Sequence, residues 1–410
     1  MNNNSPSLNL LAVAATALLL TSVSAQDWPQ WRGANRDARA AGFKAPAAWP
    51  KELTQKWKAE VGQSDATPAL VGDKVFVFAR QGGEEAILCL DAATGKEVWQ
   101  NKYDAQPATG PAGRHPGPRS SPTVADGKIV TFGVRGTISC LDAASGKILW
   151  RKDDYPGAWP RFFTASSPLI VDGLCVAQVG TKGNGAVVAY DMASGGQKWK
   201  WASEGPEYAS PVLFTASGSK QIVTLAEKSV VGLNLADGKL LWQIPFVPQG
   251  MAYNSATPIV DGQTVIYSGQ GRGTHAVAIE KQGDGFAPKE LWANPDVAVQ
   301  FDTPVLKNGL LFGLSNAGKF FCLDAKTGKT LWIDSVNRGG AFGSVVDAGS
   351  VLFALTPKAE LIVMEPSEKE FKQVASYKVS DKPTYAYPVI SGNRILIEDQ
   401  DSAVTLWTIE

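Results

Sequence analysis

Charged and aromatic side chains gather in short segments that each stand just before a Ser-Pro or Thr-Pro pair. One of these segments carries Arg114, His115 and Arg119, and the next carries Trp159 and Arg161. Guanidinium groups bind anions through paired hydrogen bonds and also stack on flat rings. If the fold brings the segments together, they could hold an anionic, planar ligand.

The candidate ligand-binding residues, one or more from each of five such segments, are Arg114, His115, Arg119, Trp159, Arg161, Tyr208, Tyr253, Asn254 and Asp302. The neighbouring residues Phe162, Glu207, Met251, Phe301, Phe342 and Tyr385 belong to the same or equivalent segments. Aromatic rings interleaved with a few polar groups are typical of a small-molecule or peptide site. The alternative is that these loops only plug a channel and satisfy one another.

Motifs of common enzyme classes do not occur in the sequence. His115 and His275 are the two histidines, no zinc-ligand spacing is found, and no Gly-x-Ser-x-Gly element is present. The glycine-rich stretch 269–273 is expected between two strands of a hairpin, which argues against a phosphate-binding loop. We therefore assign no catalytic residue and no metal ligand.

The elements that must position the candidate residues are repeats. Five segments run over nine residues from an acidic or amide residue, through a turn glycine, to a tryptophan; the first is Asp91–Trp99. A sixth, degenerate copy ends at Trp292, and two copies without tryptophan begin near Ser344 and Tyr387. Eight units of roughly 40–50 residues predict the blades of a propeller.

Within a unit, four short runs rich in β-branched residues are separated by Asp-Gly, Gly and Ser-Gly-Lys turns, as in residues 121–150. This pattern predicts a four-stranded antiparallel meander. No long segment after residue 26 shows helical periodicity, and the chain holds 41 glycines and 25 prolines. We therefore expect an all-β, eight-bladed β-propeller.

The repeated tryptophans are interpreted as structural. At a fixed repeat position, each is expected to pack the outer strand of its blade against the neighbouring blade, with ligand contact as the alternative. The residues are Trp57, Trp99, Trp150, Trp199, Trp242, Trp292 and Trp332.

Closure of the ring can be inferred from the two ends of the chain. The last unit supplies three strands, near residues 386–390, 394–398 and 403–409, and then stops. The segment 53–61, with Trp57, fits the missing fourth strand. An N-terminal strand that completes the last blade would remove the open edge of the sheet.

The Ser/Thr-Pro start with an Asp-Ala-x-Thr/Ser-Gly-Lys-x-x-Trp ending resembles the PQQ-like (quinoprotein-type) β-propeller repeat over residues 53–410. The opening segment 27–33, Asp-Trp-Pro-Gln-Trp-Arg-Gly, resembles the start of secreted bacterial BamB-like or PQQ-binding-like proteins. The resemblance implies an eight-bladed scaffold that dehydrogenases and non-enzymatic binding proteins share, so it does not by itself give an activity.

The resemblance implies that a quinoprotein alcohol dehydrogenase of this type carries two adjacent cysteines joined in a vicinal disulfide and a Ca²⁺ site beside PQQ. This sequence has no Cys-Cys pair, and its candidate carboxylates, Glu207 and Asp302, stand singly. We therefore expect no bound cofactor. The protein is expected to be a non-catalytic scaffold that binds a protein or peptide partner of the cell envelope, or a small molecule in the funnel, the central opening of the ring. A PQQ-dependent oxidoreductase with calcium, or a degenerate relative that binds PQQ, is the alternative.

Residues 1–25 are expected to form a signal peptide. An uncharged apolar run, Leu8–Leu20, is too short for a membrane span of about 20 residues, and Val23 and Ala25 suit cleavage before Gln26. No Lys or Arg precedes Leu8, and a membrane-leaning tail is the alternative. No cysteine lies near the cleavage point, so we expect an exported protein, periplasmic or secreted, without a lipid anchor or a transmembrane segment.

Residues 26–52 are expected to be an N-terminal extension in which Trp28, Trp31 and Arg32 pack on a face of the ring, with ligand contact by these residues as the alternative. The 39 basic and 39 acidic residues balance and form no basic stripe, which argues against a nucleic-acid partner. The four cysteines are expected to be buried free thiols. We expect a monomer.

Overall fold

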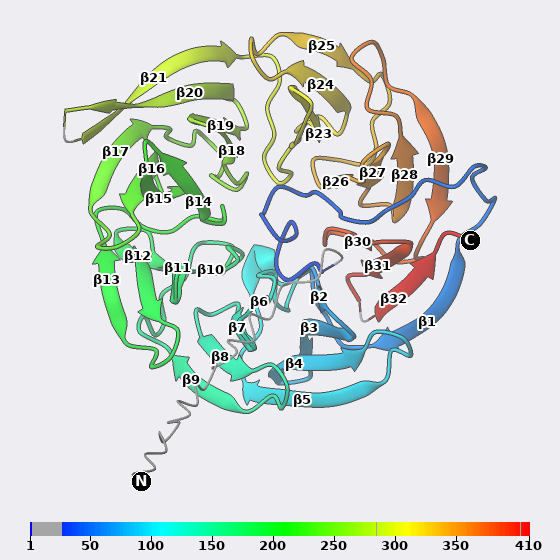
Figure 1. The fold of residues 1–410 in the computed structure, drawn as a ribbon, viewed down its shortest axis with the longest axis horizontal. Coiled ribbons are helices and arrows are strands. Elements are labelled where there is room, and N and C mark those ends of the chain that lie inside the picture. The colour runs from blue at the N-terminus through cyan, green and yellow to red at the C-terminus, as the bar shows by residue number, and fades with distance from the viewer. Residues whose placement is uncertain (2–26, 284, 402) are drawn as a thin grey trace.

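The computed structural model describes residues 1, 27–283, 285–401 and 403–410. Apart from Met1, the expected signal peptide and its cleavage point lie outside the described residues. In the part described, 32 strands form eight four-stranded antiparallel sheets around a central axis (Figure 1). No described helix is long and apolar enough to cross a membrane.

The first four blades have the following strands. Blade 1 contains β2 (Ala69–Val71), β3 (Lys74–Gln81), β4 (Glu84–Asp91) and β5 (Glu97–Asp104). A single 3₁₀ turn, η1 (Gly110–Ala112), precedes blade 2, which contains β6 (Thr123–Ala125), β7 (Lys128–Phe132), β8 (Ile138–Asp142) and β9 (Ile148–Lys152). Blade 3 contains β10 (Leu169–Val171), β11 (Leu174–Thr181), β12 (Asn184–Asp191) and β13 (Gln197–Trp201). Blade 4 contains β14 (Val212–Ala216), β15 (Ser219–Leu225), β16 (Ser229–Asn234) and β17 (Leu240–Pro245).

The other four blades follow the same order. Blade 5 contains β18 (Ile259–Asp261), β19 (Thr264–Gly269), β20 (Gly273–Gln282) and β21 (Gly285–Asn294). Blade 6 contains β22 (Val305–Lys307), β23 (Leu310–Leu314), β24 (Phe320–Asp324) and β25 (Thr330–Ile333). Blade 7 contains β26 (Ser344–Asp347), β27 (Leu352–Leu355), β28 (Glu360–Met364) and β29 (Gln373–Lys378). Blade 8 contains β30 (Val389–Ser391), β31 (Arg394–Glu398) and β32 (Ala403–Thr408), with β1 (Thr54–Glu60) as its outermost strand.

The N-terminal strand β1 closes the ring. It pairs antiparallel with β32, so that Lys58 lies opposite Thr405 and Glu60 lies opposite Ala403. The predicted eight-bladed, all-β propeller closed by an N-terminal strand is therefore confirmed. In Figure 1 the first strand, in blue, and the last strands, in red, lie side by side.

The turn glycine and the tryptophan recur together because they meet across five of the eight blade junctions. In blade 1, Asp91 Oδ1 accepts hydrogen bonds from the backbone N–H and the hydroxyl of Thr94, at 2.9 and 2.8 Å, and Gly95 follows with φ +70°. A Cβ on Gly95 would collide with the ring of Trp57 from the preceding blade. The other pairs of this kind are Trp99 with Gly146, Trp150 with Gly195, Trp199 with Gly238 and Trp292 with Gly328.

The junction between blades 4 and 5 departs from this rule. Trp242 lies over Gly232 of its own blade, and its Nε1 donates to Gln221 Oε1 at 2.6 Å. Blade 5 has the long hairpin of β20 and β21 where blades 1–4 and 6 have the short Asp- or Asn-to-Trp turn. Trp242 instead packs in a core cluster with side chains of both blades, including Val265 and Tyr267.

The Ser/Thr-Pro motif links the blades near the axis. The residue before the proline donates its backbone N–H to the equivalent hydroxyl of the next blade, as from Thr67 to Ser121 at 3.0 Å and from Ser121 to Ser167 at 3.0 Å. The chain of bonds continues through Ser210, Thr257 and Thr303 and returns from Tyr387 to Thr67 at 2.9 Å. Blade 7 is bypassed, because the backbone N–H of Thr303, in blade 6, donates to the hydroxyl of Tyr387, in blade 8, at 3.3 Å. The motif therefore ties neighbouring blades together at the axis.

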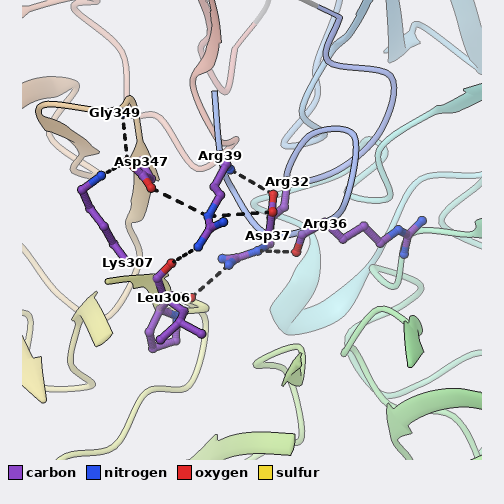
Figure 2. Close-up of polar contacts among 9 residues, drawn as sticks. Arg32, Arg36, Asp37, Arg39, Leu306, Lys307, Asp347 and Gly349 are labelled. Carbon is purple, nitrogen blue, oxygen red and sulfur yellow. Dashed lines mark hydrogen bonds and ion pairs between the residues drawn. The ribbon is translucent and has the colours of Figure 1, made fainter. Parts of the chain in front are cut away.

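One end of the central channel is filled by residues 27–52, here called the strap. Trp28 and Leu70 exchange two backbone hydrogen bonds, at 2.7 and 2.9 Å, and Ala40 N–H donates to Asp347 O. In Figure 1 the strap is a blue coil that starts in the middle of the ring and runs outward to the rim, where Phe43 packs on Phe353 of blade 7. Figure 2 shows Arg39 of the strap beside Asp347, which also accepts from Lys307 Nζ at 2.7 Å.

Two strap arginines enter the channel itself. Arg32 and Arg36 are 1% and 5% exposed. Arg32 donates to Pro304 O at 2.9 Å and to the hydroxyl of Tyr387 at 3.0 Å, and also to Thr303 O. Arg36 donates to backbone carbonyls of blades 3 and 4, including Pro211 O at 2.8 Å. Their buried N–H groups are therefore satisfied by the innermost parts of several blades.

The cysteines make no cross-link. Cys89, Cys140, Cys175 and Cys322 are all buried and free, as expected. Cys140 and Cys175 belong to one core cluster, between blades 2 and 3.

Candidate functional site

A cavity of about 400 Å³ lies at the other end of the channel and is lined from all eight blades. Eight of its residues occupy one repeat position, three before the proline that starts each blade: Asp65, Arg119, Ala165, Tyr208, Ser255, Phe301, Phe342 and Tyr385. In blade 7, Val345 stands where the other blades have proline. Because equivalent positions surround one axis, a scattered set of residues becomes a ring.

Aromatic side chains form two walls of the cavity. In one wall His115 contacts Tyr385 at 4.9 Å, Tyr385 contacts Phe342 at 5.4 Å, and Phe342 stacks on Phe301 at 4.3 Å, all measured between ring centroids. In the other wall Tyr253 contacts Phe162 at 5.1 Å and Tyr208 at 5.7 Å. Such a lining favours burial of an apolar or aromatic group.

The strap supplies the floor. Trp31 lines the cavity together with Ser210 and Thr257, and its ring meets that of Tyr387 edge to face at 5.7 Å. Arg32, the next residue, is buried in the channel. The channel is thus closed on this side, and we define the resulting space, with its aromatic walls and Trp31 floor, as the cup.

Three charged residues and a histidine line the cup. Asp65 Oδ2 lies 2.7 Å from His115 Nδ1, while Asp65 Oδ1 is buried without a hydrogen-bond partner in the part of the chain described. Arg119 donates to the carbonyls of His115 at 2.6 Å, Ala112 at 3.2 Å and Phe162, and burial lowers its pKa. Arg119 therefore holds two loops in place as well as lining the cup.

The structure brings only part of the predicted set together. Arg114, His115, Arg119, Tyr208 and Tyr253 line the cup, and their role in ligand binding stays a prediction. Asp65 and Trp31 also line it and were not among the predicted residues. The position three residues before each proline would have selected Asp65, whereas nothing in the repeat could have placed Trp31, which lies outside it.

Trp159, Arg161, Asn254 and Asp302 are not among the lining residues. Trp159 stacks on Phe163 at 5.5 Å, and Arg161 is exposed with its guanidinium 5.5 Å from the Phe162 ring.

Asn254 and Asp302 are fully buried and serve the scaffold. Asn254 donates to Ala226 O at 2.8 Å and accepts from Arg272 at 2.7 Å. Asp302 accepts from the backbone N–H of Leu314 at 2.8 Å and from the hydroxyl of Tyr387 at 3.2 Å. Burial raises the pKa of Asp302 to about 6 and that of Glu207 to about 7.

The lining residues do not fit a calcium–PQQ site. Hard cations such as Ca²⁺ take six to eight oxygen ligands. Asp65 is the one carboxylate among the lining residues, and one of its oxygens is held by His115. Among the described residues no three His, Cys, Asp or Glu side chains are grouped so that they could hold a metal ion. We derive no reaction step through such a group.

A second hollow, of about 680 Å³, lies between blades 2 and 3. Its polar lining includes Lys152, Asp154, Asn184 and Lys200. Because only two blades contribute to it, the repeat does not focus side chains there as it does at the axis.

Comparisons with known proteins agree with this architecture. The family model described as outer membrane protein assembly factor BamB matches residues 47–154, 83–334 and 322–410. BamB of Burkholderia pseudomallei is 25% identical over 369 residues, which cover 86% of this chain and 87% of that protein. Quinohemoprotein alcohol dehydrogenase ADH IIB of Pseudomonas putida is 27% identical over 314 residues, covering 73% of this chain but 38% of the dehydrogenase.

Solved structures are similar in fold. The crystal structure of BamB from Moraxella catarrhalis superposes with a TM-score of 0.66 at 15% identity, over 87% of this chain and all of that chain. A europium-containing methanol dehydrogenase gives a TM-score of 0.74 at 12% identity, over 94% of this chain and 98% of that chain. At such identities these likenesses show the fold alone. The three segments matched by the family model together cover residues 47–410, and the chain therefore belongs to the family described as outer membrane protein assembly factor BamB.

Proposed function

We propose that this protein is an exported, non-catalytic propeller scaffold that binds a protein or peptide partner in the cell envelope through the cup. The observation that carries the proposal is the convergence of aromatic side chains from six blades on one cavity that opens at one end of the channel. Such a lining is suited to burying an apolar group of a partner. Its charged groups are largely engaged with one another or with backbone carbonyls.

The comparisons support the same reading. The family model and the Burkholderia pseudomallei relative are described as outer membrane protein assembly factors, a name that refers to the assembly of other proteins. In this proposal residues 1–25 are a cleaved signal peptide, residues 26–52 are an N-terminal extension that includes the strap, and residues 53–410 form the ring. The exported form carries no lipid anchor. N-terminal sequencing should find Gln26 first, and a mature form that retains Leu8–Leu20 would contradict the export step.

Site-specific photocrosslinking in the native host tests the role of the cup. A photoreactive amino acid at Phe342, which is 39% exposed at the mouth, should give a protein adduct that disappears when Phe301 is replaced by alanine. The same group at Leu149, 44% exposed on the outer strand β9, is the matched control. Equal adducts at both positions, or none at Phe342, would contradict binding through the cup.

The similarity to quinohemoprotein alcohol dehydrogenases keeps PQQ binding as a second candidate function. It is tested by titrating the purified protein with PQQ and Ca²⁺ while following the quinone absorbance and alcohol-dependent dye reduction. Saturable quinone binding with alcohol-dependent turnover would replace the scaffold proposal. Absence of both would remove the candidate.

A further inference from the structure

The mouth of the cup exposes a pair of stacked phenylalanines. Phe301 and Phe342 come from blades 6 and 7, are 40% and 39% exposed, and lie with ring planes 2° apart. Most other large aromatic side chains of the ring are buried or partly covered. An exposed apolar surface beside a cavity is typical of a binding site rather than of an ordinary surface.

Arg114 lines the cup in the segment that leads into blade 2, and Arg161 lies in the segment that leads into blade 3, outside the lining. The guanidinium groups of Arg114 and Arg161 are exposed, and neither has a hydrogen bond or ion pair to the described residues. Arg119 lies in the same wall. The carboxylate among the lining residues, Asp65, is paired with His115. Among the residues that line the cup, the charged group without a partner in the described chain is therefore the Arg114 guanidinium.

The closed floor limits how a ligand can enter. Trp31 and the buried Arg32 fill the channel beneath the cup, so an extended chain cannot be threaded through the ring. A volume of about 400 Å³ is near the lower end of the range of about 300–1,000 Å³ for ligand pockets. The space therefore suits a side chain that enters from a segment lying across the mouth.

We infer that the cup binds an acidic peptide segment that carries an aromatic side chain. The aromatic ring enters between the two aromatic walls, beside Phe301 and Phe342, and a neighbouring carboxylate pairs with Arg114. This inference rests on the proposed function and adds the chemistry of the partner. Charge-assisted pairing at an exposed guanidinium contributes specificity more than affinity, whereas burial of the ring supplies most of the binding free energy.

Synthetic peptides with the full-length mature protein test the inference by isothermal titration calorimetry. The probe is acetyl-Gly-Asp-Phe-Gly-amide, with Asn-Phe and Asp-Ala versions as matched controls. The Asp-Phe peptide should bind about fivefold more tightly than the Asn-Phe peptide, a difference of about 1 kcal/mol, and more than tenfold more tightly than the Asp-Ala peptide. The Asp preference should decrease at high salt because exposed charges are screened.

Protein variants separate the two contacts. Arg114→Gln should remove the preference for Asp over Asn, and Phe301→Ala with Phe342→Ala should weaken both Phe-containing peptides more than tenfold. Arg39→Gln makes the same charge change at the strap end of the channel, with a side chain that is 54% exposed, and should leave the preference unchanged.

Equal binding of the Asp-Phe and Asn-Phe peptides, or an Asp preference that survives Arg114→Gln, would overturn the inference. Crosslinking at Phe342 distinguishes failure of this inference from failure of the proposed function. If the adduct forms while the Asp preference is absent, the cup is a partner site of different chemistry and only this inference fails. If the adduct is also absent, the proposed function fails with it.

Discussion

The two ends of the central channel are built from similar residue types but differ in how those residues are satisfied. At the strap end, the guanidinium groups of Arg32 and Arg36 are buried and donate to backbone carbonyls of blades 3, 4 and 6. At the cup end, Arg114 is exposed and unpaired within the described chain, and Phe301 and Phe342 are about 40% exposed. Buried polar groups that are fully paired stabilise one conformation, whereas groups left unpaired at a cavity mouth are available to a ligand.

The difference shows that a cluster of arginines and aromatic rings is not by itself a site. Arg119 illustrates the intermediate case, because it lines the cup while its N–H groups hold the loops of blades 2 and 3. We therefore expect substitutions at the strap end to change the free energy of unfolding and substitutions at the cup mouth to change binding.

Removing residues 1–62 should have the largest effect. It deletes the strap and β1, which leaves β32 as an unpaired edge strand and opens the channel. We expect aggregation, or a loss comparable with the whole folding free energy of about 5–15 kcal/mol. Size-exclusion chromatography and thermal melting measure it, with a chain lacking only residues 1–52 as the comparison that retains β1. A monomeric 63–410 chain with an unchanged melting temperature would refute closure by β1.

Arg32→Met should lower the free energy of unfolding by about 3 kcal/mol. The substitution removes the donor of Pro304 O and one of the two donors of Thr303 O in a buried place, and an unpaired buried acceptor costs about 1–3 kcal/mol. Urea denaturation followed by tryptophan fluorescence measures the change. Arg39→Met, at a 54% exposed side chain, is the control and should cost under about 1 kcal/mol. Equal effects of the two variants would mean that burial in the channel has no special role.

Asp302 should make stability depend on pH. Burial raises its pKa to about 6 from an ordinary value of 3.8, so the folded state binds the proton more tightly than the unfolded state. The associated stability is fully present below about pH 4 and is lost as the pH rises through 6. The shift corresponds to at most about 3 kcal/mol. Melting temperatures of wild type and Asp302→Asn between pH 4 and 8 should show a flatter profile for the variant, and parallel profiles would contradict the assignment.

Phe301→Ala with Phe342→Ala should have the smallest effect on stability, about 2 kcal/mol. Both rings are about 40% exposed and lie against each other, with Phe342 also against Tyr385, so the double variant loses less buried area than truncation of two core phenylalanines would. Urea denaturation checks this, and the peptide titrations described above should show the loss of binding. A double variant that unfolds easily would mean that the pair is part of the scaffold, and the contrast between the two ends would then fail.

The architecture could be predicted from the sequence because each blade of a propeller repeats the same residue pattern. The spacing from Asp91 to Trp99 recurs often enough to count the blades, and the absence of a fourth strand after residue 409 pointed to the segment 53–61. The sequence also indicated which loops approach the axis. It did not show which residues of each loop face the cup. Asn254 and Asp302 were therefore expected at the site although they are buried in the scaffold, and Asp65 was not predicted.

What the sequence determined by itself is the repeating local structure, since turn chemistry, strand alternation and the paired glycine and tryptophan are all encoded within about 50 residues. Only the tertiary structure decided which end of the channel is open. The strap is outside the repeat, and its arginines bind backbone carbonyls, which every residue possesses and no motif reveals. The floor of the cup, Trp31, is therefore set by a contact between segments that are far apart in the chain.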